Sequence, residues 1–246
     1  MQYQKSGLVV VIPVYNEQDC IEEVITSWGS FLNGYLKDIT FKIVVINDGS
    51  KDNTPKILDD LTTTLPYLHR VHQKNGGHGE AVLNGYAEAL KFTPDWVFQV
   101  DSDNQFLPED FPKLWENRSK SDFILGFRKK RYDEFNRLII TRIVRIIIFL
   151  LYGVFVTDSN IPYRLIKGTY LPLLLRDLPG RPFAPNIFLT VMAKKDGNDL
   201  MFIPVTHKER ETGQVSIIKW KLLKVCFRSA KELLSFAFTI KKRVYK

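Results

Sequence analysis

The sequence predicts an α/β fold built on a mostly parallel sheet flanked by helices, and two observations lead to this prediction. Short apolar runs rich in β-branched residues alternate with helical patterns through the first half of the chain. Each apolar run is followed by loop residues before the next helical pattern begins, as in βαβ units. With 246 residues, 45% of them hydrophobic and 25% charged, the chain is long enough for one such domain with a helical appendage.

The elements of the first half are expected in regular alternation. The expected strands are 8–12, 41–46, 68–71 and 96–100. The expected helices are 18–32, 54–64, 80–91 and 108–117. Pro55 and Pro108 support two of these helices, because proline is favoured in the first turn. Residues that carry chemistry are then expected in the loops after the strands, at the carboxyl edge of the sheet.

The second half of the sequence has a different character. Residues 135–156 form a long, apolar and basic helical pattern, 186–194 a shorter helix and 200–205 a strand. Residues 217–241 interleave apolar side chains with lysine and arginine, which is typical of an amphipathic helix on a membrane surface. The same pattern also suits a terminal helix packed on its own domain. C-terminal amphipathic helices are therefore expected to complete the fold.

Composition limits the compartment and the partners. The net charge is +8, and lysine and arginine gather at 128–145 and 219–246, where they suit nucleic acid, anionic lipid or a phosphate-bearing substrate. The apolar run at 8–12 is too short for a signal peptide, and no uncharged apolar stretch is long enough to span a membrane. Cys20 and Cys226 fit a reducing compartment, both buried or neutral. We expect a cytoplasmic protein, peripheral on the cytoplasmic face of a membrane.

The segment Asp101-Ser102-Asp103 follows the expected strand 96–100 and is the first candidate for chemistry. Two carboxylates at i and i+2 repel each other at the edge of a sheet, and a divalent cation with oxygen ligands compensates this repulsion. Mg²⁺ or Mn²⁺ would link them to a substrate diphosphate. A lone pair of this kind is more often a solvated acidic turn. Other polar clusters on the same edge favour the metal site here.

Two further polar clusters follow earlier strands. In Asn47-Asp48-Gly49-Ser50, the Asp48 carboxylate can accept hydrogen bonds from a nucleobase or a ribose, Gly49 permits a tight turn, and Ser50 can cap the next segment. In the segment 13–17, Tyr15 can stack on a base and Glu17 starts a helix. Taken singly, each cluster also fits an ordinary turn.

The three clusters together, in this order and spacing, resemble the family-2 glycosyltransferases, which have the GT-A fold, a Rossmann-like α/β architecture. The segment 75–81, Asn-Gly-Gly-His-Gly-Glu-Ala, looks like that family's glycine-rich turn beside the donor, and its His78 reads as an ordinary loop histidine. Asn47 stands where many relatives carry a second aspartate. The resemblance implies donor contacts, with a UDP- or GDP-linked sugar, from Pro13, Tyr15, Glu17, Asp48, Gly79 and Asp101.

Further motifs are similar to the dolichyl-phosphate mannose synthase branch, which uses polyprenyl-phosphate acceptors. The matching segments are Asp101-x-Asp103-x-Gln105, Gly126-Phe127-Arg128, Arg137 with Thr141, Asp158 with Tyr163-Arg164, and 210–216. The branch usually has serine at the place of Thr141. The loop 210–216 is one residue longer than usual, and Ile217 replaces a lysine after Ser216. The resemblance covers residues 9–216, and its donor-side motifs are more specific than its acceptor-side motifs.

The branch implies a role for each residue of the site. The implied metal ligands are Asp101, Asp103 and Gln105; the implied catalytic residues are Asp101, Asp103, Arg128 and Asp158; the implied acceptor-phosphate contacts are Arg128, Arg137, Thr141, Arg210 and Ser216. Elementary chemistry supports the acceptor, because a phosphate is already an anion and needs positive charge more than a base. Arginine binds phosphate through two parallel hydrogen bonds. The implied reaction is an inverting, Mg²⁺- or Mn²⁺-dependent transfer of a hexose to polyprenyl phosphate.

The implied organisation is one GT-A domain over residues 1–216 and a basic helical tail over 217–246. Residues 1–127 form its nucleotide-sugar half and 128–216 its acceptor half. One alternative is transfer to a hydroxyl of a growing surface glycan, for which Asp158 would serve as base. The other is a basic nucleic-acid-binding protein, which lacks support because no reader motif is present and an acidic sheet edge repels phosphate.

Overall fold

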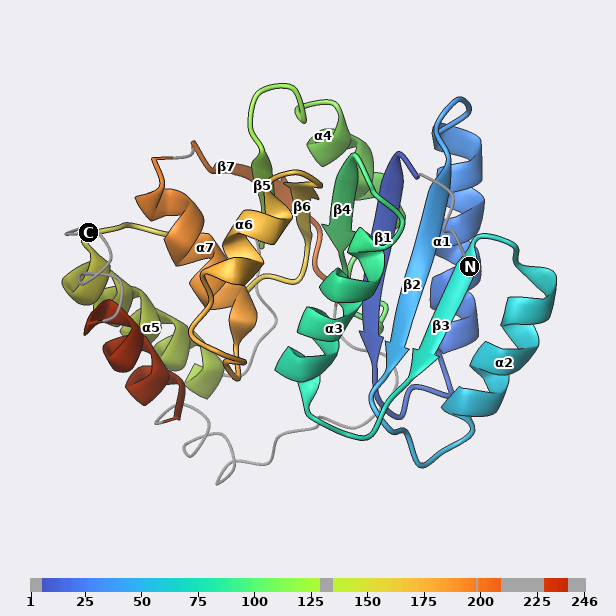
Figure 1. Cartoon of the computed structure of the whole chain (residues 1–246), viewed down its shortest axis with the longest axis horizontal. Helices are drawn as coiled ribbons and strands as arrows, with labels where there is room; N and C mark the ends of the chain where they lie inside the picture. The colour runs from blue at the N-terminus through green and yellow to red at the C-terminus, as the bar shows by residue number, and fades with distance from the viewer. Residues whose placement is uncertain (1–5, 129–134, 198, 209–227, 239–246) are drawn as a thin grey trace.

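The computed structural model describes residues 6–128, 135–197, 199–208 and 228–238, without the side chains of 135–141. It contains a seven-stranded sheet in the order β3-β2-β1-β4-β6-β5-β7, with helices packed on both of its faces (Figure 1). The strands are β1 (Leu8–Val14), β2 (Phe41–Asn47), β3 (Leu68–His72), β4 (Trp96–Gln99), β5 (Phe123–Arg128), β6 (Arg164–Lys167) and β7 (Met201–Val205). Among the described residues, neighbouring strands pair in parallel except where β6 takes part, so the predicted mostly parallel sheet is confirmed.

The helices fill the crossovers between these strands. They are α1 (Ile21–Tyr35), α2 (Thr54–Thr64), α3 (His78–Leu90), the 3-10 turn η1 (Pro108–Asp110), α4 (Phe111–Trp115), α5 (Phe135–Tyr152), α6 (Leu171–Arg176) and α7 (Pro185–Lys195). A last helical segment covers 228–238. In Figure 1, α3 lies in front of β1 and β2, and α1 lies behind them.

The strand β1 has a continuous apolar sequence because it lies at the centre of the sheet. Every residue of β1 is buried, because a parallel strand covered on both faces exposes neither set of its side chains. The helix α3 packs directly on this strand. A Cβ on Gly85 would lie 2.3 Å from Val11 Cγ1, so glycine lets α3 approach β1 closely.

The expected elements differ from the observed ones mainly at their ends. The helix expected at 18–32 begins at Ile21 and the strand expected at 200–205 begins at Met201, while the helix expected at 108–117 divides into η1 and α4. The helix expected at 135–156 ends at Tyr152, where Gly153 has a positive φ of 68°. The strands β5 and β6 and the helix α6 were not predicted, since each is short and lies between basic or proline-containing segments.

The strand β6 runs against its neighbours, and this reversal shapes the site. Its first residue, Arg164, pairs with Gln99 at the end of β4. The loop that enters β6 therefore lies at the same sheet edge as the loops that leave β4 and β5. Arg164 is fully buried and donates to the carbonyl oxygens of Ile161 and Asn186 at 2.9 and 3.0 Å, which holds this entering loop in place.

The C-terminal part of the described chain packs beside α5 (Figure 1). The Tyr152 hydroxyl donates to the Leu233 carbonyl oxygen, and the Tyr152 and Phe236 rings lie 6.2 Å apart. The expected helix 217–241 is thus helical over 228–238, and its remaining residues lie outside the described part of the chain, as does Cys226. Cys20 is buried, as predicted. Within the described residues, no helix has the length and apolar character needed to cross a bilayer.

Candidate active site

The loops after β1 and β2 are joined to each other at the carboxyl edge of the sheet. The arrowheads of β1, β2 and β3 point to this edge, the lower one in Figure 1. The Asn16 amide donates to Ser50 Oγ at 2.9 Å, and the Lys51 amide donates to Asn16 Oδ1 at 2.8 Å. The predicted clusters 13–17 and 47–50 therefore form one surface. Ser50 does not cap α2, which was expected of it, because its hydroxyl serves this contact and the residue before α2 is Asn53.

Asp48 holds the glycine-rich turn. Its carboxylate is buried and accepts hydrogen bonds from the amides of Gly76 and Gly77, both at 2.8 Å, and from Gln73 Nε2 at 2.7 Å. Gly49 has a φ of 71°, and a Cβ there would lie 2.7 Å from the Asn75 amide nitrogen. The turn after β2 and the turn before α3 thus fit closely against each other, as the Gly49 prediction requires.

Asn47 connects the end of β2 to the end of β3 and to the turn that follows β2. Its Nδ2 lies 2.9 Å from His72 Nδ1 at the end of β3, and its Oδ1 accepts from the Ser50 amide at 3.0 Å. His72 Nε2 in turn lies 3.0 Å from Asp59 Oδ1 on α2. Asn47 is buried by these contacts and fixes the end of β2, on which Asp48 depends.

Asp101 and Asp103 stand past the end of β4, where the sequence placed them. Burial raises the pKa of Asp101 to about 6; His78 opposes the rise and the negative charge of Asp103 adds to it. His78 Nε2 lies 3.9 Å from Asp101 Oδ1. Asp101 Oδ1 itself is buried and has no hydrogen-bond partner among the described residues. A buried carboxylate oxygen without a hydrogen bond, beside a second carboxylate, is an unfavourable arrangement that a cation would relieve.

The donor set at this place fits a hard divalent cation only in part. Asp103 Oδ1 accepts a hydrogen bond from the Gln105 amide at 3.3 Å, which holds the Asp103 carboxylate against its own turn. Gln105 Nε2 donates to the Lys208 carbonyl oxygen at 3.0 Å, and its Oε1 is the atom that a metal would bind. Within the described residues, no group of three or more His, Cys, Asp or Glu side chains is placed to hold a metal. The remaining ligands would come from a substrate diphosphate and from water.

Arg128 and Asp158 form a buried ion pair. Arg128 Nε lies 2.9 Å from Asp158 Oδ2, and Arg128 Nη2 lies 3.2 Å from Asp158 Oδ1. The side chains are 12% and 5% exposed. The end of β5 supplies the arginine and the loop entering β6 supplies the aspartate, so the reversed strand brings together two residues that the sequence proposed separately.

The other predicted residues fall into two groups. Pro13 is buried in β1, Tyr15 is exposed beyond it, and Glu17 is buried with its amide donating to Thr54 Oγ1 at 3.0 Å. Glu17 precedes α1 and does not start it. Gly79 lies in the first turn of α3. The backbone of Arg137 and Thr141 belongs to α5, whereas their side chains, Arg210 and Ser216 lie outside the described part.

Sequence reasoning missed two residues at this edge. His78 was interpreted as an ordinary loop histidine, although its place between Gly77 and Gly79 in the glycine-rich turn was a usable signal. Arg181, in the loop before α7, forms an ion pair with Glu80 and contacts Asn84 on α3. No local pattern in 176–184 points to this contact, because it joins residues about a hundred positions apart.

Curated relatives of this chain are named as transferases that act on polyprenyl phosphates. The chain is 28% identical over 219 residues to the UDP-N-acetylglucosamine–dolichyl-phosphate N-acetylglucosaminyltransferase of Methanococcus voltae, covering 80% of this chain and 84% of that protein. It is 25% identical to the undecaprenyl-phosphate 4-deoxy-4-formamido-L-arabinose transferase of Pseudomonas fluorescens, covering 89% of this chain. The match spans only 62% of the length of that second relative. These names agree with the predicted branch.

A solved structure shares the fold. Glucosyl-3-phosphoglycerate synthase from Mycobacterium tuberculosis, solved with Mn²⁺, uridine diphosphate and glucosyl-3-phosphoglycerate, superimposes with a TM-score of 0.69 at 19% identity, covering 94% of this chain and 80% of that one. The predicted GT-A fold is thereby confirmed. The model of the family described as Glycosyl transferase family 2 matches residues 9–170, well over half of the chain. The match includes Asp48, Asp101 and Asp103. The chain therefore belongs to the family-2 glycosyltransferases and is a glycosyltransferase.

Proposed function

We propose that this enzyme transfers a hexose from a nucleotide-diphosphate sugar to a polyprenyl phosphate, with inversion at the anomeric carbon. The observation that carries the proposal is the buried Oδ1 of Asp101, which has no hydrogen-bond partner among the described residues and lies beside Asp103, at the sheet edge where Asp48 fixes the glycine-rich turn. A divalent cation supplies the positive charge that the two carboxylates of this edge lack. A nucleoside diphosphate can then bind to the same cation. The names of the polyprenyl-phosphate relatives and the bound nucleotide of the structural relative support it.

On the donor side, Tyr15 and Asp48 hold the nucleotide, and Pro13, Glu17 and Gly79 shape the surface around it. Asp101 and Asp103 hold Mg²⁺ or Mn²⁺, with the Gln105 amide oxygen as a third protein ligand. When bound, the cation neutralises the charge that develops on the leaving diphosphate.

On the acceptor side, Arg128, Arg137 and Arg210 bind the acceptor phosphate, and Thr141 and Ser216 add hydroxyl contacts. Asp158 orients Arg128, since both of its oxygens contact that guanidinium. This contact favours a phosphate acceptor over a glycan hydroxyl. A hydroxyl needs a general base, and both oxygens of the Asp158 carboxylate are already engaged by the Arg128 guanidinium.

The apolar outer surface of α5 and the 228–238 helix supports the proposal that the enzyme acts at the cytoplasmic face of a membrane, on a lipid-linked acceptor. We define this surface by its large exposed residues, Ile143, Ile146, Phe149, Leu150, Phe155, Leu234 and Phe238. Those of α5 recur at helical spacing on one face. Arg142 and Lys231 are exposed on the same helices and can attract anionic headgroups.

The test is a two-stage measurement on the purified chain. First, binding of UDP and of GDP is measured with Mn²⁺ or Mg²⁺ and again after a chelator. We expect one of the two nucleotides to bind, and we expect the chelator to abolish this binding. Second, nucleotide sugars are screened for transfer to a short polyprenyl phosphate. Metal-dependent nucleotide binding with transfer only to a glycan hydroxyl would favour the alternative acceptor. Salt-sensitive nucleic-acid binding that survives the chelator would contradict a glycosyltransferase site altogether.

A further inference from the structure

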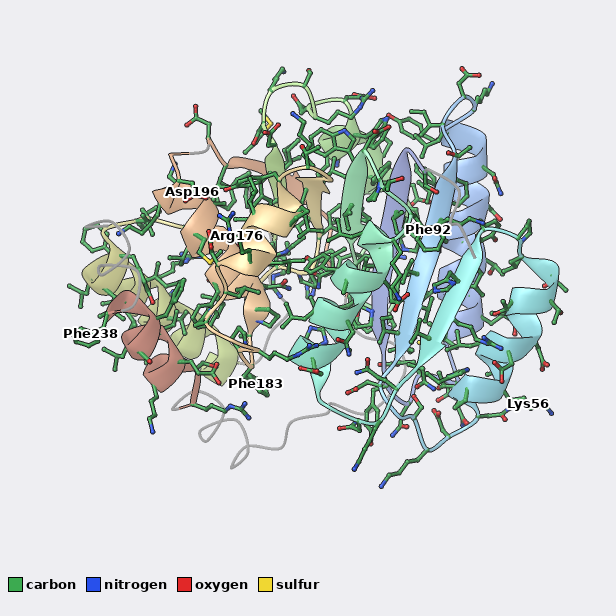
Figure 2. All side chains as sticks on the ribbon, in the orientation of Figure 1. Lys56, Phe92, Arg176, Phe183, Asp196 and Phe238 are labelled. Carbon is green, nitrogen blue, oxygen red and sulfur yellow. The ribbon has the colours of Figure 1, made fainter. Side chains whose placement is uncertain are left out.

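The loop before α7 makes an unusually close contact with the start of α3. A Cβ added to Gly79 would lie 2.3 Å from the Phe183 carbonyl oxygen and 2.9 Å from the Pro182 carbonyl oxygen. Only glycine therefore lets the backbone of 182–183 rest on the first turn of α3. We call residues 181–183 the strap, because they lie between α3 and the 228–238 helix; Figure 2 labels Phe183 near the foot of α3.

On its α3 side, the strap is connected to Asp48 by successive side-chain contacts. Arg181 forms an ion pair with Glu80 and a hydrogen bond with Asn84 Oδ1. Asn84 Nδ2 donates to Gln73 Oε1 at 2.6 Å, and Gln73 Nε2 donates to Asp48 Oδ1 at 2.7 Å. Each amide in this series uses one end for the previous contact and the other end for the next, so the orientation of each is fixed by its neighbours.

On its other side, the strap is held by the 228–238 helix. The Phe183 amide donates to Glu232 Oε2 at 3.0 Å. Glu232 is itself paired with Arg228, whose Nε lies 2.9 Å from Glu232 Oε1 and whose Cζ lies 5.6 Å from the Phe183 ring centre. Glu232 thus contacts both the strap backbone and the Arg228 side chain. A change in the position of the 228–238 helix would alter both contacts.

We propose that Arg181 is a positioning residue for the donor site and that the strap couples the 228–238 helix to Asp48. Arg181 and the strap backbone fix Asn84 and Gln73, and these amides fix the carboxylate that orders the Gly76 and Gly77 amides. The residue acts through Asp48 and does not touch the donor. The expected consequence, tighter nucleotide binding, rests on the proposed function. The coupling between the strap and Asp48 does not, because it concerns contacts within the chain alone.

The experiment compares Arg181→Ala, Arg181→Lys and Glu232→Ala with the full-length wild type. Two controls match them: Arg176→Ala, an exposed arginine paired with Asp177 on α6 and labelled away from Phe183 in Figure 2, and Lys231→Ala, beside Glu232. Amide hydrogen exchange of the peptide covering 75–77 reports the order of the turn without any ligand. Affinity for UDP or GDP with Mn²⁺ reports whether the ordered turn contributes to nucleotide binding, and the melting temperature reports overall folding.

Both alanine variants should speed exchange at 75–77 and weaken nucleotide binding roughly two- to fivefold, the scale of one partly exposed charged contact. Arg181→Lys should recover part of the loss, and the controls should match the wild type. The double variant Arg181→Ala, Glu232→Ala should lose less than the sum of the single losses, because both act through one strap.

Unchanged exchange in both alanine variants would overturn the coupling. Faster exchange with unchanged nucleotide affinity would overturn the role of Arg181 as a positioning residue for the donor site. Additive losses in the double variant would overturn the shared route through the strap. The proposed function fails separately, when the wild type binds neither nucleotide with metal. In that case exchange at 75–77 in the same variants still decides whether the strap orders the turn.

Discussion

The carboxyl ends of β1, β2 and β4 and the surface of α5 with the 228–238 helix present opposite kinds of side chain. At the first, polar groups are buried and bound to each other, as Asp48 is to the Gly76 and Gly77 amides. At the second, large apolar groups are exposed, with Leu150 at 73% and Phe238 at 70%. A preordered polar edge suits a small charged ligand that needs fixed partners. An exposed apolar surface suits a partner that is itself extended and apolar.

The largest effect should come from the polar edge. Asp103→Ala should raise the barrier to transfer by several kcal/mol, roughly a thousandfold in kcat, because the cation loses one hard ligand. Steady-state transfer against Mn²⁺ concentration measures this loss. Asp60→Ala, an exposed carboxylate of α2, serves as the control. Since Asp103 lies on a partly exposed loop, its variant should melt at the wild-type temperature. Full activity of Asp103→Ala at low Mn²⁺ would remove the metal role.

The next effect concerns the ion pair between Arg128 and Asp158. Asp158→Ala should lower the free energy of unfolding by about 3–5 kcal/mol, because the largely buried Arg128 guanidinium would lose both of its contacts with the Asp158 carboxylate. Urea unfolding measures this loss. The matched control is Asp177→Ala, which removes the exposed Arg176 pair and should change the free energy of unfolding far less. Equal losses for the two variants would mean that the Arg128 pair is solvated in solution.

A smaller effect should separate acceptor use from donor use. Arg137→Ala and Arg210→Ala should each lower kcat/KM for polyprenyl phosphate roughly ten- to a hundredfold, the value of one charge-assisted contact. Nucleotide affinity should stay at the wild-type value, and Arg176→Ala should leave both quantities unchanged. Lysine should restore only part of the loss, because an ammonium lacks the two-pronged geometry. Normal acceptor kinetics in both alanine variants would favour the glycan-hydroxyl acceptor.

The smallest effect tests the apolar surface. Wild-type protein should float with anionic liposomes at low salt and be partly released at high salt, because both burial and charge attraction contribute. Leu150→Glu with Phe238→Glu should reduce flotation by placing carboxylates against the headgroups. Leu173→Glu, at a leucine exposed to 47% on α6, is the matched control. If the wild type never floats with anionic liposomes, the surface serves another partner.

The sequence predicted the polar edge better than the opposite half, and the reason is physical. The runs at β1, β2 and β4 are short, apolar and β-branched, and the polar residues directly after them must lie together once the strands are parallel. Local pattern therefore determined where Asp48, Asp101 and Asp103 would meet. The strand β6 has only four residues and begins with Arg164, whose burial depends on carbonyl groups from the entering loop and α7. Nothing local to β6 indicates that cover.

The contacts that complete the site could not be predicted for the same reason. The Arg128–Asp158 pair joins the end of β5 to the loop entering β6, and the sequence indicated neither strand, although each residue was singled out by its motif. The order of the glycine-rich turn depends on Asp48, and through Gln73 and Asn84 on Arg181. These are contacts between distant segments, and their geometry exists only after the sheet and α3 have packed.

The reversed strand has a consequence for how this architecture can vary. In a fully parallel sheet, the loops that enter the strands lie at the edge opposite the ligand, and changes in their length are remote from it. Here the connection from α5 into β6 reaches the ligand edge itself, because Arg164 pairs with the last residue of β4. Insertions or deletions in 153–163 can therefore remodel the wall beside Arg128 without altering the register of β1, β2 or β4. The acceptor can diversify in this way while the machinery for the nucleotide stays the same.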